Sequence, residues 1–134
     1  MLKIEHIGIA VEDLKAANEL YKNLLGSEHY KEEAVEIEGV VTSFFKVGDT
    51  KIELLKATDP DSPIAKFIEH RGQGIHHIAF EVQDILVEMD RLKKLGFTFT
   101  KDTPSRGADN KLVCFVHPRS ANGVLIELCQ EIPA

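Results

Sequence analysis

Residues Ile4–Leu24 read IEHIGIAVEDLKAANELYKNL, and residues Ile75–Leu95 read IHHIAFEVQDILVEMDRLKKL. Aligned with His6 on His77, the two stretches share the identical pairs Ile4/Ile75, His6/His77, Ile7/Ile78, Val11/Val82, Asp13/Asp84, Lys22/Lys93 and Leu24/Leu95. A second match lies near the end of each half, where KIELL at Lys51–Leu55 resembles LIELC at Leu125–Cys129. Self-similarity of this kind predicts a duplicated supersecondary unit.

Each copy begins with the pattern of a strand followed by a helix. Apolar Ile7, Ile9 and Val11 alternate with smaller or polar residues, which is the two-residue period of a strand. Asp13 and Asp84 stand where a helix N-cap belongs, and apolar residues at helical spacing follow each of them. Gly26 and Gly96 fall where the chain leaves each helix and suit a left-handed backbone.

Three further strands are expected in each half: Tyr30–Ile37, Val40–Val47 and Thr50–Lys56 in the first, and Thr98–Asp102, Lys111–His117 and Gly123–Gln130 in the second. A linker helix at about 61–73 is predicted to start at Ser62, with Pro63 in its first turn. The sequence therefore predicts an α+β fold of two tandem βαβββ modules, about 1–57 and 75–132, in a single domain spanning 1–134.

The composition limits the classes of function. A net charge of −6 argues against nucleic-acid binding as the main task. The chain has no apolar run near the ~20 residues of a membrane span, and its start lacks the features of a signal peptide. Cys114 and Cys129 have no metal-type spacing. We therefore expect no membrane partner, a cytoplasmic location and two reduced, buried cysteines.

Four residues carry the chemistry of the repeat. His6 and His77 occupy the same position of the duplicated first strands, and Glu53 and Glu127 the same position of the last strands. Both glutamates have apolar neighbours, and a carboxylate buried in such a strand needs a cation or a proton. Two imidazoles and two carboxylates converging on one cleft would suit a divalent metal. The alternative is a symmetric pair of His–Glu hydrogen bonds in the core.

The remaining histidines have no such partner in the repeat. His76 adjoins His77 and is expected to point to the opposite face and to pack there. We interpret His29, His70 and His117 as surface or loop residues. The acid-rich stretch Glu28–Glu38 is expected to be a solvated strand or loop that borders the cleft at most.

With these residues in hand, the chain resembles the vicinal oxygen chelate superfamily, which includes glyoxalase I and the extradiol dioxygenases. The resemblance covers nearly the whole chain and is greatest to the methylmalonyl-CoA epimerase family. Its most specific stretches are DSPIAKF at Asp61–Phe67, GIHHIAFEV at Gly74–Val82 and HPRSANGVLIEL at His117–Leu128.

The resemblance implies a curved mixed sheet around a metal cleft, with His6, His77 and Glu127 as ligands and Glu53 at a fourth position. It also implies Co²⁺, with Mn²⁺, Zn²⁺ or Ni²⁺ as substitutes, because His/Glu sets accept all of them. The expected activity is interconversion of 2R- and 2S-methylmalonyl-CoA, and the expected assembly is a homodimer.

The chemistry implied by the family is abstraction of the C2 proton to give an enolate, which a metal stabilises as a Lewis acid. Glu127 is the implied catalytic base on one face. Some members carry a second glutamate three residues after the glycine that corresponds to Gly39, whereas this chain has Thr42 there. The second proton carrier is therefore open between Glu36, Glu38 and a metal-bound water.

Other functions stay open on the sequence. A glyoxalase I-like lyase would use a similar ligand set, a non-catalytic small-molecule-binding relative would lack the metal ligands, and a dioxygenase would use two histidines and one carboxylate on Fe(II). Candidates for CoA contacts are Lys101, Arg106, Lys111 and Arg119, although each alone is more typical of a solvated surface charge.

Overall fold

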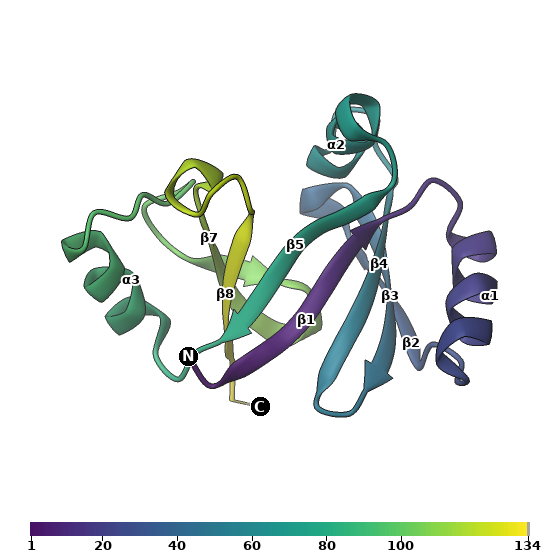
Figure 1. Ribbon diagram of the computed structural model, residues 1–134, viewed down its shortest axis with the longest axis horizontal. Helices are drawn as coiled ribbons and strands as arrows, with labels where there is room; N and C mark the ends of the chain where they lie inside the picture. The colour runs from purple at the N-terminus through teal and green to yellow at the C-terminus, as the bar shows by residue number, and fades with distance from the viewer. Residues whose placement is uncertain (134) are drawn as a thin grey trace. The chain divides into compact units, whose positions relative to one another are not determined.

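The βαβββ order occurs twice in a computed structural model that describes residues 1–133 (Figure 1). The first module comprises β1 (Lys3–Ala10), α1 (Leu14–Leu25), β2 (Lys31–Val35), β3 (Val40–Val47) and β4 (Thr50–Ala57). Helix α2 (Pro63–Arg71) follows it. The second module comprises β5 (Gly74–Glu81), α3 (Ile85–Lys94), β6 (Ser105–Gly107), β7 (Lys111–Val116) and β8 (Ile126–Glu131). Short 3₁₀ turns η1, η2 and η3 lie at Glu36–Glu38, Ala108–Asn110 and Pro118–Ser120.

The strands pair in the same way in each module. In the first the order is β2-β3-β4-β1, with β1 parallel to β4 and the other neighbours antiparallel. In the second the order is β5-β8-β7-β6, with β5 parallel to β8. The predicted α+β fold of tandem βαβββ modules, with mixed sheet pairing, is confirmed.

The chain forms two compact units, whose boundaries differ slightly from those of the repeated modules. The first unit is His6–His76, and the second unit is Met1–Glu5 together with the chain from His77 onward. The N-terminal residues belong to the second unit because they pair with it: the Leu2 N–H donates to the Glu81 carbonyl at 2.8 Å.

The helix starts follow from side-chain caps. Asp13 accepts a hydrogen bond from the Ala16 N–H at 3.0 Å, and Asp84 accepts from the N–H groups of Leu86 and Val87 at 3.1 and 3.2 Å. Ser62 caps α2 by accepting from the Ala65 N–H. Each cap satisfies donors that the first helical turn leaves unpaired. The predicted starts of all three helices are confirmed.

Three predicted strands differ from the structure. The last of them, expected at Gly123–Gln130, runs instead from Ile126 to Glu131. The first was expected to run to Ile37 but ends at Val35, because η1 turns the chain before Gly39. The strand predicted at Thr98–Asp102 is wrong: only Phe99 forms an isolated bridge, with Val116, and β6 lies further along. There Gly107 lets β6 approach β7 closely, since an added Cβ would lie 3.1 Å from the Val113 methyl groups.

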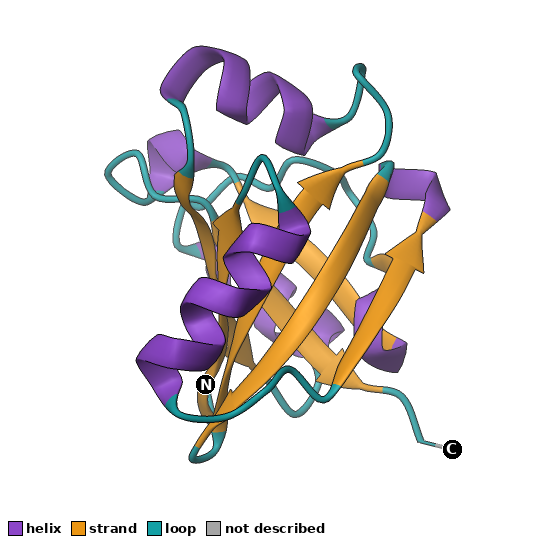
Figure 2. Ribbon diagram, turned by 90° about the vertical axis from the view of Figure 1, so that its right-hand side faces the viewer, coloured by secondary structure: helices purple, strands orange, loops and turns teal. Residues whose placement is uncertain are grey.

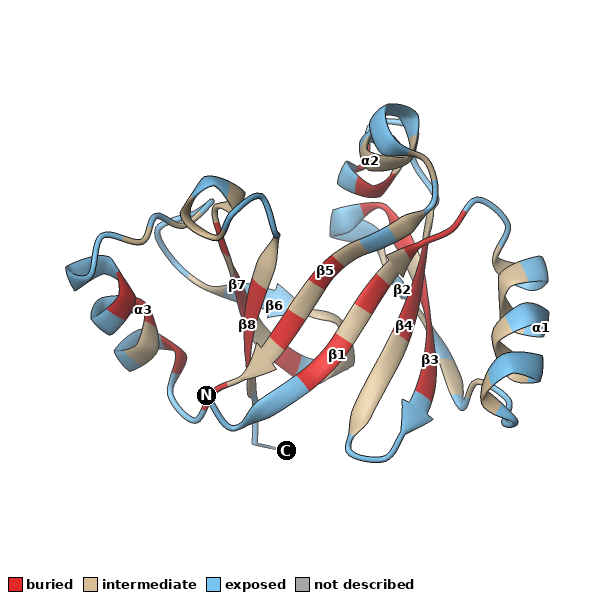
Figure 3. Cartoon of the chain, viewed as in Figure 1, coloured by how far each residue is buried: buried red, intermediate tan, exposed pale blue. Residues whose placement is uncertain are grey.

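Most of the buried residues lie on the strands and on α2 and α3 (Figure 3), and a helix lies across the strands of the first unit (Figure 2). In the first unit α1 covers one side of the sheet, where Phe45 and Leu54 are fully buried. Helix α2 packs with Ile64 on Leu55, on the other side. In the second unit the buried residues of α3, among them Met89, pack against β7 and β8. Each helix thus covers one side of its sheet, and the apolar side chains on that side are buried against it.

The structure also bears on the predictions of buried cysteines and of no membrane span. Cys114 and Cys129 are buried free thiols, as predicted. Burial is the main cause that raises the pKa of Cys114 to about 12, and the charge of Glu127 adds to it. Among residues 1–133, the helices are too short or too polar to cross a membrane.

Substitution of Gly39 tests whether the turn after β2 depends on a residue without a side chain. The φ of Gly39 is +64° and an added Cβ would lie 3.0 Å from the Cβ atoms of Asp59 and Ser62. Gly39→Ala should therefore lower the free energy of unfolding by more than the ~1–2 kcal/mol of a left-handed alanine alone. Gly48→Ala is the control, because Gly48 has φ +60° with open space around its Cβ position. Equal losses in urea denaturation of the two variants would contradict the steric argument.

Candidate metal and proton-transfer site

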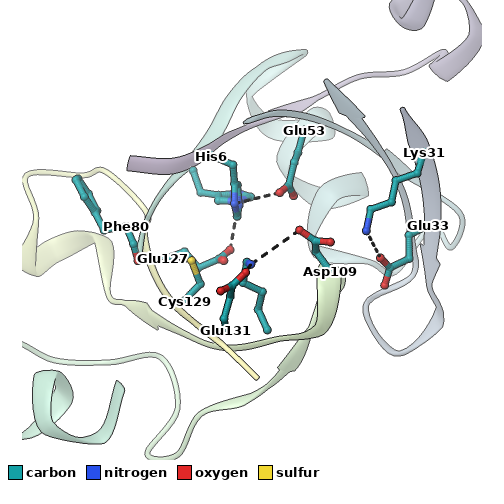
Figure 4. Close-up of polar contacts among 11 residues, drawn as sticks. His6, Lys31, Glu33, Glu53, Phe80, Asp109, Glu127, Cys129 and Glu131 are labelled. Carbon is teal, nitrogen blue, oxygen red and sulfur yellow. Dashed lines mark hydrogen bonds and ion pairs between the residues drawn. The ribbon is translucent and has the colours of Figure 1, made fainter. Parts of the chain in front are cut away.

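His6 and Glu53 form a buried pair in the first unit. The His6 Nδ1 lies 3.0 Å from a Glu53 carboxylate oxygen, and both residues are 5% exposed (Figure 4). They come from neighbouring parallel strands, in which Glu53 stands beside Gly8. Gly8 has no side chain and shares the side of β1 that carries His6, so the imidazole and the carboxylate meet over it.

His77 and Glu127 form the equivalent pair in the second unit. The His77 Nε2 lies 3.3 Å from a Glu127 oxygen, and the residues are 5% and 6% exposed. Here the small neighbour of the glutamate is Ala79 on β5. On the other side Phe115 of β7 pairs with Glu127 and places its ring edge-on to His77, with centroids 5.9 Å apart.

The repeat is therefore preserved in three dimensions, down to the neighbours of each carboxylate. Phe44 of β3 stands beside Glu53 as Phe115 stands beside Glu127. No sequence motif marks these two phenylalanines, although both lie at equivalent places before the last strand of each half. An aromatic wall beside a buried carboxylate excludes water and strengthens its attraction for a cation.

The donor atoms of each pair suit a divalent metal. Two ligands about 2.1 Å from one ion, at the angles of octahedral or tetrahedral coordination, are about 3.0–3.4 Å apart. The separations of 3.0 and 3.3 Å fall in this range. A carboxylate this deeply buried needs a compensating charge, which a cation supplies better than a neutral imidazole.

His76 packs, as expected from its position. Its ring meets that of Phe67 edge-on, with the ring centroids 5.0 Å apart and an angle of 81° between the ring planes. Burial lowers the pKa of His76 to about 4, so this imidazole is neutral at physiological pH. The other histidines lie at the surface or half-buried: His29 contacts Glu32 at 3.1 Å, His70 contacts the Lys66 carbonyl, and His117 caps η3.

The four basic residues considered for CoA contacts do not share one environment. Lys101, Arg106 and Arg119 are exposed. Lys111 is not the solvated surface charge that its sequence context suggested, because it is only 4% exposed. It lies 3.6 Å from Glu131 and 4.0 Å from Asp109. Its position at the start of β7, facing β8, could not be derived without the strand pairing.

Thr42 is buried on β3, 1% exposed, on the side of the sheet that carries Glu53. Its neighbour Ser43 points the other way and donates to Asn18 of α1 at 2.6 Å. Glu36 and Glu38, the carboxylates considered for the second proton transfer, are exposed on η1. The residue paired directly with Thr42 on β2 is instead Glu33, which the sequence does not distinguish from its neighbours in the acid-rich stretch Glu28–Glu38.

Known proteins share both the sequence and the fold. The family described as Glyoxalase/Bleomycin resistance protein/Dioxygenase superfamily matches residues 5–115. An ethylmalonyl-CoA/methylmalonyl-CoA epimerase of Cereibacter sphaeroides is 44% identical, over 96% of this chain and 97% of its own length. The crystal structure of methylmalonyl-CoA epimerase from Mycobacterium tuberculosis is 37% identical with a TM-score of 0.93, covering 98% of this chain and 89% of that one.

A further solved structure carries a ligand in its description. It is a methylmalonyl-CoA epimerase in complex with methylmalonyl-CoA and NH4+, 34% identical with a TM-score of 0.93, and it covers 98% of this chain and 95% of its own. Similarity of this extent, over almost the full length of both partners, establishes the family. The chain belongs to the glyoxalase/bleomycin resistance protein/dioxygenase superfamily and, within it, to the methylmalonyl-CoA epimerases.

Proposed function

We propose that this protein is an isomerase that interconverts 2R- and 2S-methylmalonyl-CoA by moving the C2 proton. The observation that carries the proposal is the pair of buried His–Glu contacts at equivalent positions of the repeat, in a chain whose relatives over nearly the full length include a named epimerase. The complex of a relative with methylmalonyl-CoA supports the choice of substrate.

The proposed metal ligands are His6, Glu53, His77 and Glu127, with Co²⁺ as the preferred ion. Two imidazoles and two carboxylates would balance a divalent charge, and an ion that accepts more than four ligands would still bind a substrate oxygen. When bound, the ion supplies a Lewis acid that stabilises negative charge developing on the thioester oxygen. We further propose a cytoplasmic homodimer; the two free thiols support a reducing compartment.

Glu127 is proposed to take the proton from one face of C2. The C2–H bond lies between a thioester carbonyl and a carboxylate, so its electron pair is delocalised into the thioester once the proton leaves. The Glu127 carboxylate is buried and held by His77 at 3.3 Å, which fixes its orientation before the substrate arrives. A positioned base of this kind typically contributes 10²–10⁴-fold to a proton transfer.

The decisive experiment is exchange of the C2 proton of methylmalonyl-CoA in D₂O, followed by NMR, with and without added Co²⁺. The metal-loaded protein should exchange the proton and interconvert the epimers, and the metal-free protein should do neither. The hemithioacetal of methylglyoxal and glutathione serves as the control substrate for a glyoxalase I-like lyase. Turnover of that compound, without exchange of the C2 proton of methylmalonyl-CoA, would contradict the proposal and indicate a glyoxalase I-like lyase.

Thr42→Val tests whether the buried hydroxyl at this position moves a proton. We expect the variant to keep substantial epimerase activity, within about tenfold of the parent, because a threonine hydroxyl is a poor base near neutral pH. The substitution conserves shape on a side chain that is 1% exposed. A folded, metal-loaded Thr42→Val protein without activity would point to a water held by the hydroxyl as the second proton carrier.

A further inference from the structure

The side of the first-unit sheet that carries Glu53 extends to the edge strand β2. Across β3 and β4, Phe44 pairs with Glu53, and across β2 and β3, Lys31 pairs with Phe44. One step along, Glu33 pairs with Thr42. Directly paired residues of antiparallel strands project to the same side of the sheet. Lys31 and Glu33 therefore share the Glu53 face, by which we mean the sheet side that carries His6, Thr42, Phe44 and Glu53.

The opposite orientation is excluded by the neighbours of Glu33 in β2. Glu32 accepts a hydrogen bond at 3.2 Å from the amide of Asn18, which belongs to α1 on the other side of the sheet. Because successive strand residues alternate between sides, Glu33 points away from α1. Figure 4 shows the Lys31–Glu33 pair and the His6–Glu53 pair, each joined by a dashed line.

The surroundings of Glu33 combine fixed orientation with access to water. Lys31 Nζ lies 3.7 Å from a Glu33 oxygen and 4.6 Å from the centre of the Phe44 ring. The ring thus holds the ammonium, and the ammonium orients the carboxylate. The Glu33 side chain is 36% exposed, whereas that of Glu53 is 6% exposed. This partial exposure lets the Glu33 carboxyl exchange its proton directly with water.

We propose that Glu33 is the second proton carrier of the epimerisation, acting on the face of C2 opposite to Glu127; the inference rests on the proposed function. In one direction, Glu127 takes the C2 proton, the C–H electron pair enters the enolate, and protonated Glu33 forms the new C–H bond on the other face. Epimerisation in reverse exchanges the two roles. Each carboxyl returns to its starting state by proton exchange with water.

The geometry favours Glu33 over the other groups nearby. Glu33 is in register with Leu55, two residues along β4 from Glu53. At about 4.8 Å per strand and about 3.3 Å per residue, the backbones of Glu33 and Glu53 are about 12 Å apart, which leaves room for a flat enolate. Glu36 and Glu38 are exposed on η1, beyond the end of β2. A lysine ammonium ordinarily keeps its proton at neutral pH, so Lys31 is poorly suited to accept one in the reverse reaction.

Glu33→Gln provides the test, with each epimer of methylmalonyl-CoA supplied separately to Co²⁺-loaded protein in D₂O. We expect epimerisation to fall by about 10²-fold or more. The epimer whose C2 proton faces Glu127 should still exchange that proton, with its configuration retained, while the other epimer should not exchange. Metal content, thermal unfolding and calorimetric binding of racemic methylmalonyl-CoA should match the parent.

The matched control is Glu36→Gln, the same chemical change at an exposed position of η1, which should behave as the parent. Two results for Glu33→Gln would overturn the inference: epimerisation at the parental rate, or an equal loss of exchange from both epimers, which would indicate a structural role. Failure of the parent protein to exchange either epimer would instead refute the proposed function itself, so the two failures are distinguishable.

Discussion

Glu127→Gln should reduce epimerisation of methylmalonyl-CoA by about 10²–10⁴-fold while the protein stays folded. The amide still offers an oxygen to a metal ion and keeps the shape of the side chain, but it cannot accept the C2 proton at neutral pH. Because Glu127 is 6% exposed and in contact with His77, its replacement removes the proposed base from a buried site in which its orientation is fixed. The measurement is the rate of epimerisation by NMR at saturating Co²⁺.

The exchange pattern separates the two roles proposed for Glu127, metal ligand and catalytic base. The epimer whose proton faces Glu127 should lose C2 exchange in the variant. Exchange from both epimers at the parental rate would show that Glu127 is a ligand only. Glu69→Gln, at an exposed position of α2, controls for loss of one negative charge. Thermal unfolding of Glu127→Gln near the parental temperature, in the presence of Co²⁺, confirms that the loss is chemical.

His77→Ala should act through metal binding and not through the proton transfer itself. Without the imidazole at 3.3 Å, Glu127 remains buried with one fewer partner, and a site of four proposed ligands is reduced to three. We expect activity to be lost at stoichiometric Co²⁺ and to be partly restored by a large excess, because mass action offsets weaker binding. Titration of chelator-treated protein with Co²⁺, read as activity and as metal content, measures the change.

Thermal unfolding distinguishes this result from purely structural His–Glu hydrogen bonds. A ligand that binds only the folded state raises the unfolding temperature with its concentration. Co²⁺ should therefore stabilise chelator-treated parent protein at micromolar concentrations and stabilise His77→Ala only at much higher ones. His70→Ala, an exposed histidine on α2, should respond as the parent does. A parental unfolding temperature that is independent of Co²⁺ would contradict the metal site.

The sequence by itself determined the parts of the protein that depend on local pattern. The starts of the three helices are predicted by the N-cap residues Asp13, Ser62 and Asp84, because an N-cap accepts hydrogen bonds from amides only two or three residues away. The alternation around Ile7 and Ile78 specifies strands, and the repeated His and Glu positions identify equivalent places in the two modules. These signals need no knowledge of which strands lie side by side.

Strand pairing decided the rest, because a two-residue period shows that sides alternate but not which side faces what. It sets Gly8 beside Glu53 and Ala79 beside Glu127, so that each carboxylate meets a histidine over a small residue. It turns Glu33 toward the Glu53 face while Glu36, three residues later, stays exposed. The register between strands distant in the sequence is a tertiary property. The proposal of Glu33 over its acidic neighbours depends on that register.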